Sequence, residues 1–191
     1  MGSREEKYTD ITKAAIRVFS EHGFDGAKME YIAKAAGIGK GTVYEYFESK
    51  EQLFEEILKF SLEELSLGLE KSMEQGETIE EKLLNCSRFN AEFLSSHMDI
   101  FQIAMQVNML SKEVRAQLMA EYVLIAEHYT EMVKQAKARG EVQSDLDEEL
   151  AIFCIIGTLD QFSKQRVFCD HCPLEEIDHQ SIVNVMLKVL R

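Results

Sequence analysis

The spacing of the apolar residues is the feature that most constrains how this chain can fold. Between Ser111 and Gly140, apolar side chains recur at steps of four, four, three, four, three and four: Val114, Leu118, Tyr122, Ile125, Tyr129, Met132 and Ala136. Such steps place side chains on one face of an α-helix, whereas a strand alternates every two residues. Only one proline, Pro173, and ten glycines interrupt the 191 residues. The sequence therefore predicts an all-α fold.

The same spacing, together with capping residues and glycines, divides the chain into predicted helices. Ser49 and Thr78 each precede a Gln or Glu three residues later, which is the capping-box pattern of a helix N-terminus. Gly23 and Gly37 are expected to end helices in the left-handed conformation. The predicted helices span, in order, residues 9–21, 29–36, 40–47, from 49 onward, 78 to a break near 97–99, 111–140, 144 or 145 to 168, and 174–190.

The distribution of charge separates an N-terminal part from the rest of the chain. Residues 1–50 hold eight basic and eight acidic side chains, whereas residues 51–191 hold 13 basic and 26 acidic ones and carry the whole formal net charge of −13. A neutral segment can approach a polyanion more readily than an acidic one. We therefore predict two domains, an N-terminal one over 1–50 that suits contact with a polyanion and a second helical domain over 51–191 that does not.

Targeting signals are not recognised in the sequence. The N-terminal residues lack the apolar core of a signal peptide, and no apolar run approaches the length of a membrane-spanning helix. We expect a cytoplasmic protein with no membrane partner, in which the four cysteines are reduced thiols.

The segment Gly37–Thr42, with the sequence GIGKGT, resembles a phosphate-binding loop only in part. It lacks the required spacing, and it follows a predicted helix, whereas such a loop follows a strand. A helix, a glycine-containing turn and a short second helix instead form the layout of a helix-turn-helix. The second helix of this motif enters the major groove of DNA with its N-terminal residues leading, and here these residues are Lys40, Gly41 and Thr42.

Gly41 and three side chains nearby favour contact with DNA. A glycine inside a helix lowers helix stability by about 1 kcal/mol relative to alanine. The missing side chain of Gly41 would let the helix backbone approach DNA closely. The alternative interpretation is that Gly41 is merely tolerated near the start of a helix. Tyr44 is expected to point away from the core and Tyr46 to lie on its flank, where phenol hydroxyls can donate to phosphate. Lys50 lies in the first turn of the next helix, where free backbone N–H groups also favour an anion.

Residues 15–54 resemble the DNA-binding domain of the TetR/AcrR family of bacterial transcriptional regulators. The matching pieces are Phe19, Gly23-Phe24, Ile32-Ala33, Ala36-Gly37, Lys40-Gly41-Thr42, Tyr44, Tyr46-Phe47 and Ser49-Lys50-Glu51. The resemblance implies that the first residues of the recognition helix contact base edges and phosphates. It also implies that Tyr44, Tyr46 and Lys50 hold the DNA backbone.

Two positions depart from the family pattern. The family usually has Ser or Thr where this chain has Ala27 and Lys28, so we expect the charge of Lys28 to replace a hydroxyl contact with phosphate. The family often has Ser at the cap of the recognition helix, where this chain has Gly39, which supplies no side-chain oxygen.

For the second domain, the resemblance implies a homodimer built on the last two long helices. Residues 151–162 and 182–190 are apolar on several sides, which suits burial on several sides; burial of both helices in a monomer core is the alternative. A dimer would present two recognition helices to the two half-sites of a palindromic operator in double-stranded DNA.

The resemblance also implies a cavity for a small-molecule effector in the second domain. Soft and aromatic side chains favour an apolar or amphipathic ligand, because methionine adapts to irregular shapes; plain core packing is the alternative for any one of them. The predicted ligand-binding residues are Phe89, Phe93, Phe101, Met105, Met109 and Tyr122.

The functional prediction is a DNA-binding transcriptional regulator, a repressor that its effector releases from the operator, and not an enzyme. A di-iron helical bundle would need two Glu-x-x-His pairs, and the sequence holds one, Glu176 to His179. A structural zinc site needs four ligands, and Cys169, His171 and Cys172 have no second Cys-x-x-C to complete one, so we predict no metal and no cofactor. The alternative is a small-molecule carrier, or a redox or metal sensor using Cys169 and Cys172, with a degenerate helix-turn-helix.

Overall fold

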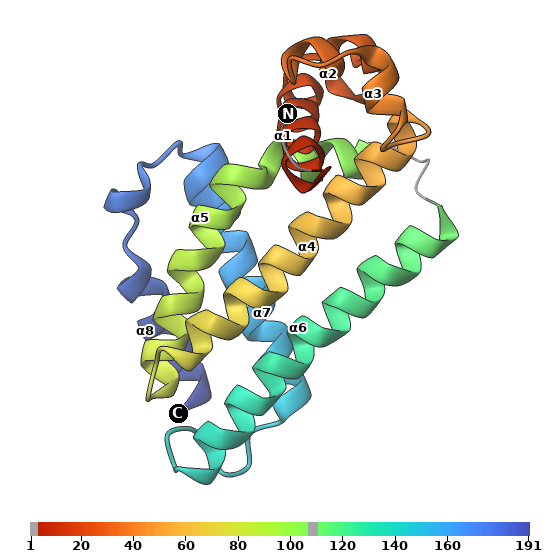
Figure 1. Ribbon diagram of the computed structural model, residues 1–191. Coiled ribbons are helices and arrows are strands. Elements are labelled where there is room, and N and C mark those ends of the chain that lie inside the picture. The colour runs from red at the N-terminus through yellow and green to blue at the C-terminus, as the bar shows by residue number, and fades with distance from the viewer. Residues whose placement is uncertain (1–3, 107–110) are drawn as a thin grey trace. The chain divides into compact units, whose positions relative to one another are not determined.

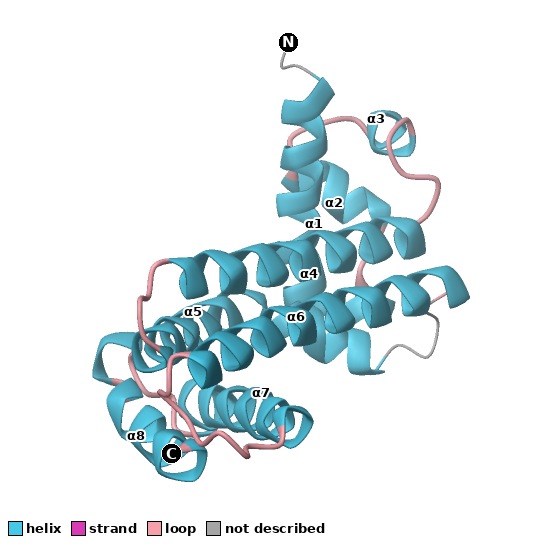
Figure 2. Ribbon diagram, turned by 90° about the horizontal axis from the view of Figure 1, so that it is seen from below, coloured by secondary structure: helices cyan, strands magenta, loops and turns pink. Residues whose placement is uncertain are grey.

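The computed structural model describes residues 4–106 and 111–191, apart from the side chains at 98, 99, 101, 102, 105 and 106, and these residues form helices and no strand (Figure 2). The predicted all-α fold class, a three-helix head followed by a helical second part, is confirmed. The elements are α1 (Arg4–Gly26), α2 (Met29–Ala35), α3 (Lys40–Tyr44), α4 (Lys50–Glu74), α5 (Ile79–Gln106), α6 (Lys112–Ala138), α7 (Glu148–Lys164), η1 (Gln165–Cys169), η2 (Leu174–Glu176) and α8 (His179–Leu190).

Side-chain caps begin the long helices where the sequence predicts them. The hydroxyls of Ser49, Thr78 and Ser111 each accept a hydrogen bond from the backbone N–H three residues on, at 3.1 to 3.2 Å. The Glu81 carboxylate completes the capping box by accepting hydrogen bonds from the N–H groups of Glu77 and Thr78. These bonds lower the pKa of Glu81. Each cap satisfies N–H groups that have no partner inside the helix.

Three glycines with positive φ end or bend helices. Gly37 and Gly140, at φ +69° and +71°, follow α2 and α6, and the residue after each donates its N–H back to a carbonyl five positions earlier. This is the Schellman arrangement, which favours glycine. Gly23 has φ 67° but ψ 175°, so the predicted left-handed cap there is wrong: the glycine kinks α1, and helix resumes to Gly26.

Three other expectations about helix bounds are wrong. The segment 97–99 does not break α5, because it contains neither proline nor glycine and the helix continues to Gln106. The next helix begins at Glu148, where the Asp147 side chain accepts from the N–H of Leu150, and not at residue 144 or 145. The last predicted helix is divided into the 3-10 turn η2 and α8, because Asp178 caps α8.

The described residues pack as two compact units. The first unit comprises residues up to 62 and the segment 97–118, and the second unit comprises 63–96 and 119–191. The long helices α4, α5 and α6 each contribute residues to both (Figure 1). The predicted division of function between 1–50 and 51–191 does not follow these packing units and stays a prediction.

The core of the first unit fixes the three N-terminal helices. The predicted apolar face of α1 is buried as expected: Ile11, Ala14, Ala15, Val18 and Phe19. The rings of Phe19, Phe24 and Phe54 lie 5.3 to 5.8 Å apart in stacked and edge-on pairs, a geometry that adds to the energy of burial. The start of α4 is therefore part of the same core as α1.

In the second unit, α4 and α5 approach closely at Gly68. A Cβ placed on Gly68 would lie 1.9 Å from Cζ of Phe89 on α5. Phe89 packs at the edge of a core formed mainly by the buried faces of α5, α6, α7 and α8. The missing side chain of Gly68 therefore provides the space that the Phe89 ring occupies.

Replacing Gly68 with alanine should lower the free energy of unfolding by about 1 to 3 kcal/mol, because overpacking forces the ring or the helix to move. Urea denaturation followed by far-UV circular dichroism measures the change. The same substitution in a Phe89→Leu background should cost much less, since the shorter side chain leaves room. An equal loss in both backgrounds would refute this explanation.

Candidate DNA-binding site and ligand hollows

Two apolar anchors fix the short helix α3 in the first unit. Val43 and Phe47 are both buried. Phe47 follows the turn at residues 45 and 46 that ends α3, and its N–H donates to the carbonyl of Val43 at 3.0 Å. Because these two side chains face inward, Lys40, Gly41 and Tyr44 are left on the exposed face of the helix. Thr42 is half-buried beside them.

The turn between α2 and α3 is fixed by backbone and side-chain bonds. The N–H of Ile38 donates to the carbonyl of Ala33 at 3.0 Å across the glycine turn. The Arg17 guanidinium of α1 donates to the carbonyl of Ala35 at 3.1 Å, at the end of α2. A C-terminal helix carbonyl has no partner within its helix, so this bond both satisfies it and ties α2 to α1.

Packing within the protein gives no reason for the glycine at position 41. A Cβ built on Gly41 would meet no other atom within 4 Å, and its φ is not positive. Alanine is the better helix former at an unstrained position. The space in front of Gly41 is open, as required for a DNA backbone or base edge to approach the helix.

The two predicted tyrosines differ in their surroundings. Tyr44 is 46% exposed. Tyr46 is half-buried against the core of the first unit, and the Arg4 guanidinium carbon lies 5.9 Å from its ring centroid. Tyr46 and Arg4 thus form a cation–π pair at the start of α1.

Lys28, the residue before α2, is exposed, and its Nζ lies 5.6 Å from the ring centroid of Tyr31. Tyr31 is itself exposed and lies 5.5 Å, centroid to centroid, from His22. Tyr31 was not among the predicted contacts. Its position follows from a helix period in which Met29, Ile32 and Ala33 face the core.

Lys50 makes contacts within the protein that sequence reasoning missed. Its Nζ donates to the carbonyls of Phe24 and Ala27 at 2.6 and 3.2 Å and lies 4.4 Å from the centroid of the Phe24 ring. The lysine therefore holds the connection between α1 and α2 against the start of α4. An ammonium group has three N–H donors, and these two bonds occupy two of them; the contact with phosphate stays a prediction.

Lys40 also has a partner that the sequence did not reveal. Its Nζ lies 2.6 Å from Oε1 of Glu30 on α2. The hydrogen bond to Lys40 lowers the pKa of Glu30, and the same bond raises the pKa of Lys40, so both groups are ionised at neutral pH. The two residues are ten positions apart on different helices, a separation that carries no local sequence pattern.

Among the predicted ligand-binding residues with described side chains, Phe89 and Phe93 lie on α5 and Tyr122 lies on α6. Phe89 and Phe93 are neighbours on α5, with ring centroids 5.9 Å apart. Tyr122 instead lines an open hollow of about 380 Å³ between α6 and α7, which we call the Tyr122 hollow; the other residues that line it include Ala126, Thr130, Ile152, Phe153 and Ile156. The side chains of Phe101 and Met105, and the whole of Met109, lie outside the described residues.

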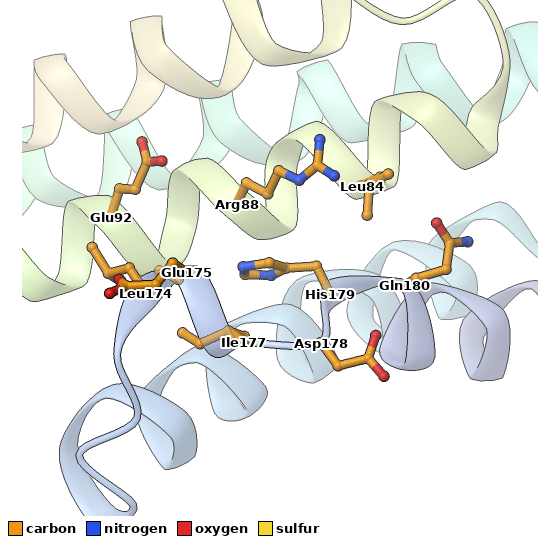
Figure 3. A pocket seen from close by; sticks show the side chains of 10 residues that line it. Leu84, Arg88, Glu92, Leu174, Glu175, Ile177, Asp178, His179 and Gln180 are labelled. Atoms are coloured by element: carbon orange, nitrogen blue, oxygen red, sulfur yellow. The ribbon is translucent and has the colours of Figure 1, made fainter.

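A second hollow of about 520 Å³, the His179 hollow, lies in the second unit between α5 and the segment from η2 to the start of α8 (Figure 3). Leu84, Arg88 and Glu92 line it from α5, and Leu174, Glu175 and residues 177–180 line it from the other side. His179 is buried with its Nδ1 2.9 Å from the Ser87 hydroxyl oxygen. Burial, with a further contribution from the Arg88 charge, lowers the pKa of His179, so the ring is neutral at pH 7.

The Ser87–His179 pair has the residue types of a hydrolytic site but not the arrangement. Ser87 is fully buried, so its hydroxyl cannot reach a substrate. Asp178 points away from the imidazole (Figure 3), and its carboxylate accepts from the N–H and the hydroxyl of Ser181 as the cap of α8. A catalytic triad requires the acid to orient the imidazole, so we interpret the pair as a satisfied polar contact in the core.

The cysteines show no metal site within the described part of the chain, where no group of three or more His, Cys, Asp or Glu side chains could hold an ion. Cys169 is exposed, and Cys172 is half-buried with its Sγ 3.6 Å from the Pro173 carbonyl oxygen. Burial raises the pKa of the Cys86 thiol to about 12, so this thiol is protonated and unreactive near neutral pH.

An anchored short helix that exposes a lysine, a glycine and a tyrosine, preceded by a helix and a glycine turn, defines a helix-turn-helix DNA-binding protein. Residues 11–57 match the sequence profile of the family described as bacterial regulatory proteins, tetR family. The resemblance seen in the sequence is confirmed, and the chain belongs to the TetR family of transcriptional regulators. No helix among the described residues has the length and apolar character needed to cross a membrane.

Several relatives align over nearly the whole chain. The fatty acid metabolism regulator protein of Bacillus subtilis is 26% identical over 194 residues, which cover 100% of this chain and 96% of that protein. The solved structure of the fatty acid degradation regulator FadR from Bacillus halodurans has a TM-score of 0.73 and 25% identity, and covers 99% of this chain and 95% of its own. The transcriptional regulator FadR from Bacillus subtilis, solved in complex with stearoyl-CoA, has a TM-score of 0.71 and 24% identity, with 95% and 96% covered.

Replacing Gly41 with alanine should separate folding from DNA binding. Because the added methyl group meets no atom of the protein and favours the helix, thermal stability should stay the same or rise. Affinity for duplex DNA should fall by at least about tenfold, since the methyl group holds the DNA away from α3. Thermal denaturation and fluorescence anisotropy measure the two effects; unchanged affinity would show that Gly41 is only a tolerated glycine.

Proposed function

We propose that this protein is a homodimeric transcriptional repressor that a small apolar or amphipathic effector releases from its operator. One observation carries the proposal: Val43 and Phe47 hold α3 so that Lys40, Gly41 and Tyr44 form an open surface, within a segment that belongs to a family of DNA-binding domains. Double-stranded DNA fits this surface because lysine and tyrosine side chains are common phosphate ligands.

The proposed DNA contacts fall into two groups. Lys40, Gly41 and Thr42 begin the recognition helix and would reach base edges and the nearest phosphates. The remaining residues lie at the end of that helix or beside it and would fix its register on the DNA backbone: Lys28, Tyr44, Tyr46 and Lys50. Because phosphate contacts carry no sequence information, sequence recognition would rest on the first group.

Exposed apolar side chains support the proposed dimer through α7 and α8. Leu150 and Phe153 on α7, with Val185 and Val189 on α8, are 54% to 63% exposed. Within each helix the two residues are three or four positions apart and therefore share a face. A soluble protein rarely leaves several large apolar side chains on neighbouring faces uncovered, and a second copy of the chain would cover them.

The proposed effector rests on the relatives and on the composition of the second unit. A fatty acid metabolism regulator and a fatty acid degradation regulator align with nearly the whole chain, and the transcriptional regulator FadR from Bacillus subtilis is solved with stearoyl-CoA. Phe89 and Phe93 offer apolar contacts on α5. A long acyl chain buries apolar surface, at about 0.8 kcal/mol per methylene, so we propose a fatty acyl compound as the effector.

Binding of the full-length protein to duplex DNA should weaken steeply with salt. A protein that contacts six phosphates loses about 10³-fold in affinity between 50 and 200 mM salt, and a dimer with these contacts should reach at least that. The duplex is one that the wild-type protein selects from a random pool. A Tyr44→Phe, Lys28→Met variant should bind the same duplex more weakly and with a smaller salt slope.

The effector is tested in the same titration. Stearoyl-CoA should displace the protein from the selected duplex, whereas free coenzyme A, which shares the headgroup but lacks the chain, should not. A protein that binds the acyl compound but shows no salt-dependent DNA binding would instead be a carrier with a degenerate helix-turn-helix. Specific DNA binding that stearoyl-CoA leaves unchanged would refute the proposed effector alone.

Placing charge on the exposed apolar face should separate the dimer without unfolding the subunit. A Phe153→Glu, Val185→Glu variant should sediment as a monomer and lose most of its affinity for the two-half-site duplex, because both side chains are already exposed in the single chain. Val123→Glu, equally exposed on α6, is the matched control and should remain a dimer. Unchanged sedimentation of the double variant would contradict dimerisation through α7 and α8.

A further inference from the structure

The ion pair between Glu30 and Lys40 places a carboxylate within the proposed DNA-binding surface. The Lys40 Nζ and Glu30 Oε1 atoms are 2.6 Å apart, and the side chains are 50% and 61% exposed. Lys40 is the first residue of α3 and so belongs to the group that would meet DNA. Its ammonium group is therefore already neutralised in the free protein by a residue of α2.

We propose that Glu30 competes with DNA for Lys40 and thereby lowers the affinity of the recognition helix for the duplex. This inference rests on the proposed DNA-binding function. On the DNA, the Lys40 ammonium has either to leave Glu30 for a phosphate or to keep a carboxylate beside that phosphate. Both routes weaken binding relative to a protein in which position 30 is uncharged.

The energetics of an exposed pair allow this competition. Exposed ion pairs contribute little to stability, so little folding energy holds Lys40 against Glu30. A like charge brought against phosphate at an interface, by contrast, is strongly unfavourable. The carboxylate therefore affects DNA binding more than it affects folding.

The charges around the pair support a local effect. Lys28 acts electrostatically on Glu30, and Tyr44 acts on Lys40, so the pair lies between two other proposed DNA contacts. The N-terminal segment 1–50 is neutral, with eight basic and eight acidic side chains. With no surplus of positive charge, removing one carboxylate at the contact surface changes a large share of the field that DNA meets.

A double-mutant cycle in the full-length protein tests the proposal. Glu30→Gln keeps an acceptor oxygen for Lys40 but removes the charge, and it should tighten binding to the selected duplex by about tenfold. In a Lys40→Met background the same substitution should change the affinity less than about twofold, because the competition no longer exists. Anisotropy titrations at several salt concentrations should also show a steeper slope for Glu30→Gln, by up to about 0.9.

Glu45→Gln provides the matched control, since it removes an exposed carboxylate next to α3 that is not the partner of Lys40. An equal gain from Glu45→Gln, or an equal gain from Glu30→Gln with and without Lys40, would assign the effect to overall charge and overturn the proposal. Weaker binding of Glu30→Gln would mean that Glu30 itself contacts the DNA, and would overturn it as well. Wild-type protein that binds no duplex at any salt concentration would refute the proposed function, whereas wild-type binding that Glu30→Gln leaves unchanged would refute only the role of Glu30.

Discussion

Burial of Val43 and Phe47 in the first unit is the interaction on which the arrangement of the DNA-binding surface depends. Complete burial of a valine or phenylalanine side chain contributes about 1.5 to 3 kcal/mol each, whereas a five-residue helix is not stable alone in water. The helix α3 therefore exists because these two side chains pack against α1, α2 and the start of α4. Their inward direction also decides that Lys40, Gly41 and Tyr44 face outward, so folding and recognition share one cause.

Local sequence signals predicted much of the fold. The caps at Ser49, Thr78 and Ser111 and the end of α2 at Gly37 depend on hydrogen bonds within a few residues, so their patterns are visible in the sequence. The predicted break near residue 97 is wrong, because polar residues that interrupt the apolar period can look like the end of a helix although α5 continues. The sequence predicts a positive φ at Gly23, and the structure has one. Its ψ of 175° differs from that of a left-handed cap, and the Phe24 ring that follows packs against Phe19, a contact that a local sequence pattern does not predict.

The candidate site was predicted in its residue types but not in its pairings. The outward positions of Lys40, Gly41 and Tyr44 on α3 follow from helix period alone. The bonds from Lys50 to the carbonyls of Phe24 and Ala27 join residues 26 and 23 positions apart, respectively. The Glu30–Lys40 pair crosses the turn between α2 and α3. Such pairings depend on tertiary structure. A basic residue in a DNA-binding motif can therefore have an internal partner that its sequence position does not disclose.

The internal partners give the neutral N-terminal segment a consistent physical interpretation. A strongly basic surface binds any DNA tightly, and a regulator must leave its operator when the effector arrives, so moderate electrostatic affinity is an advantage. Here Glu30 holds Lys40, and main-chain carbonyls hold Lys50, so that part of the positive charge is already engaged before DNA is met. Residues 51–191 carry the whole formal net charge of −13, so their net charge adds no attraction for DNA. Under the proposed function, affinity for DNA would depend on a few contacts at α2, α3 and the start of α4, and a small displacement of these helices would be sufficient to lose it.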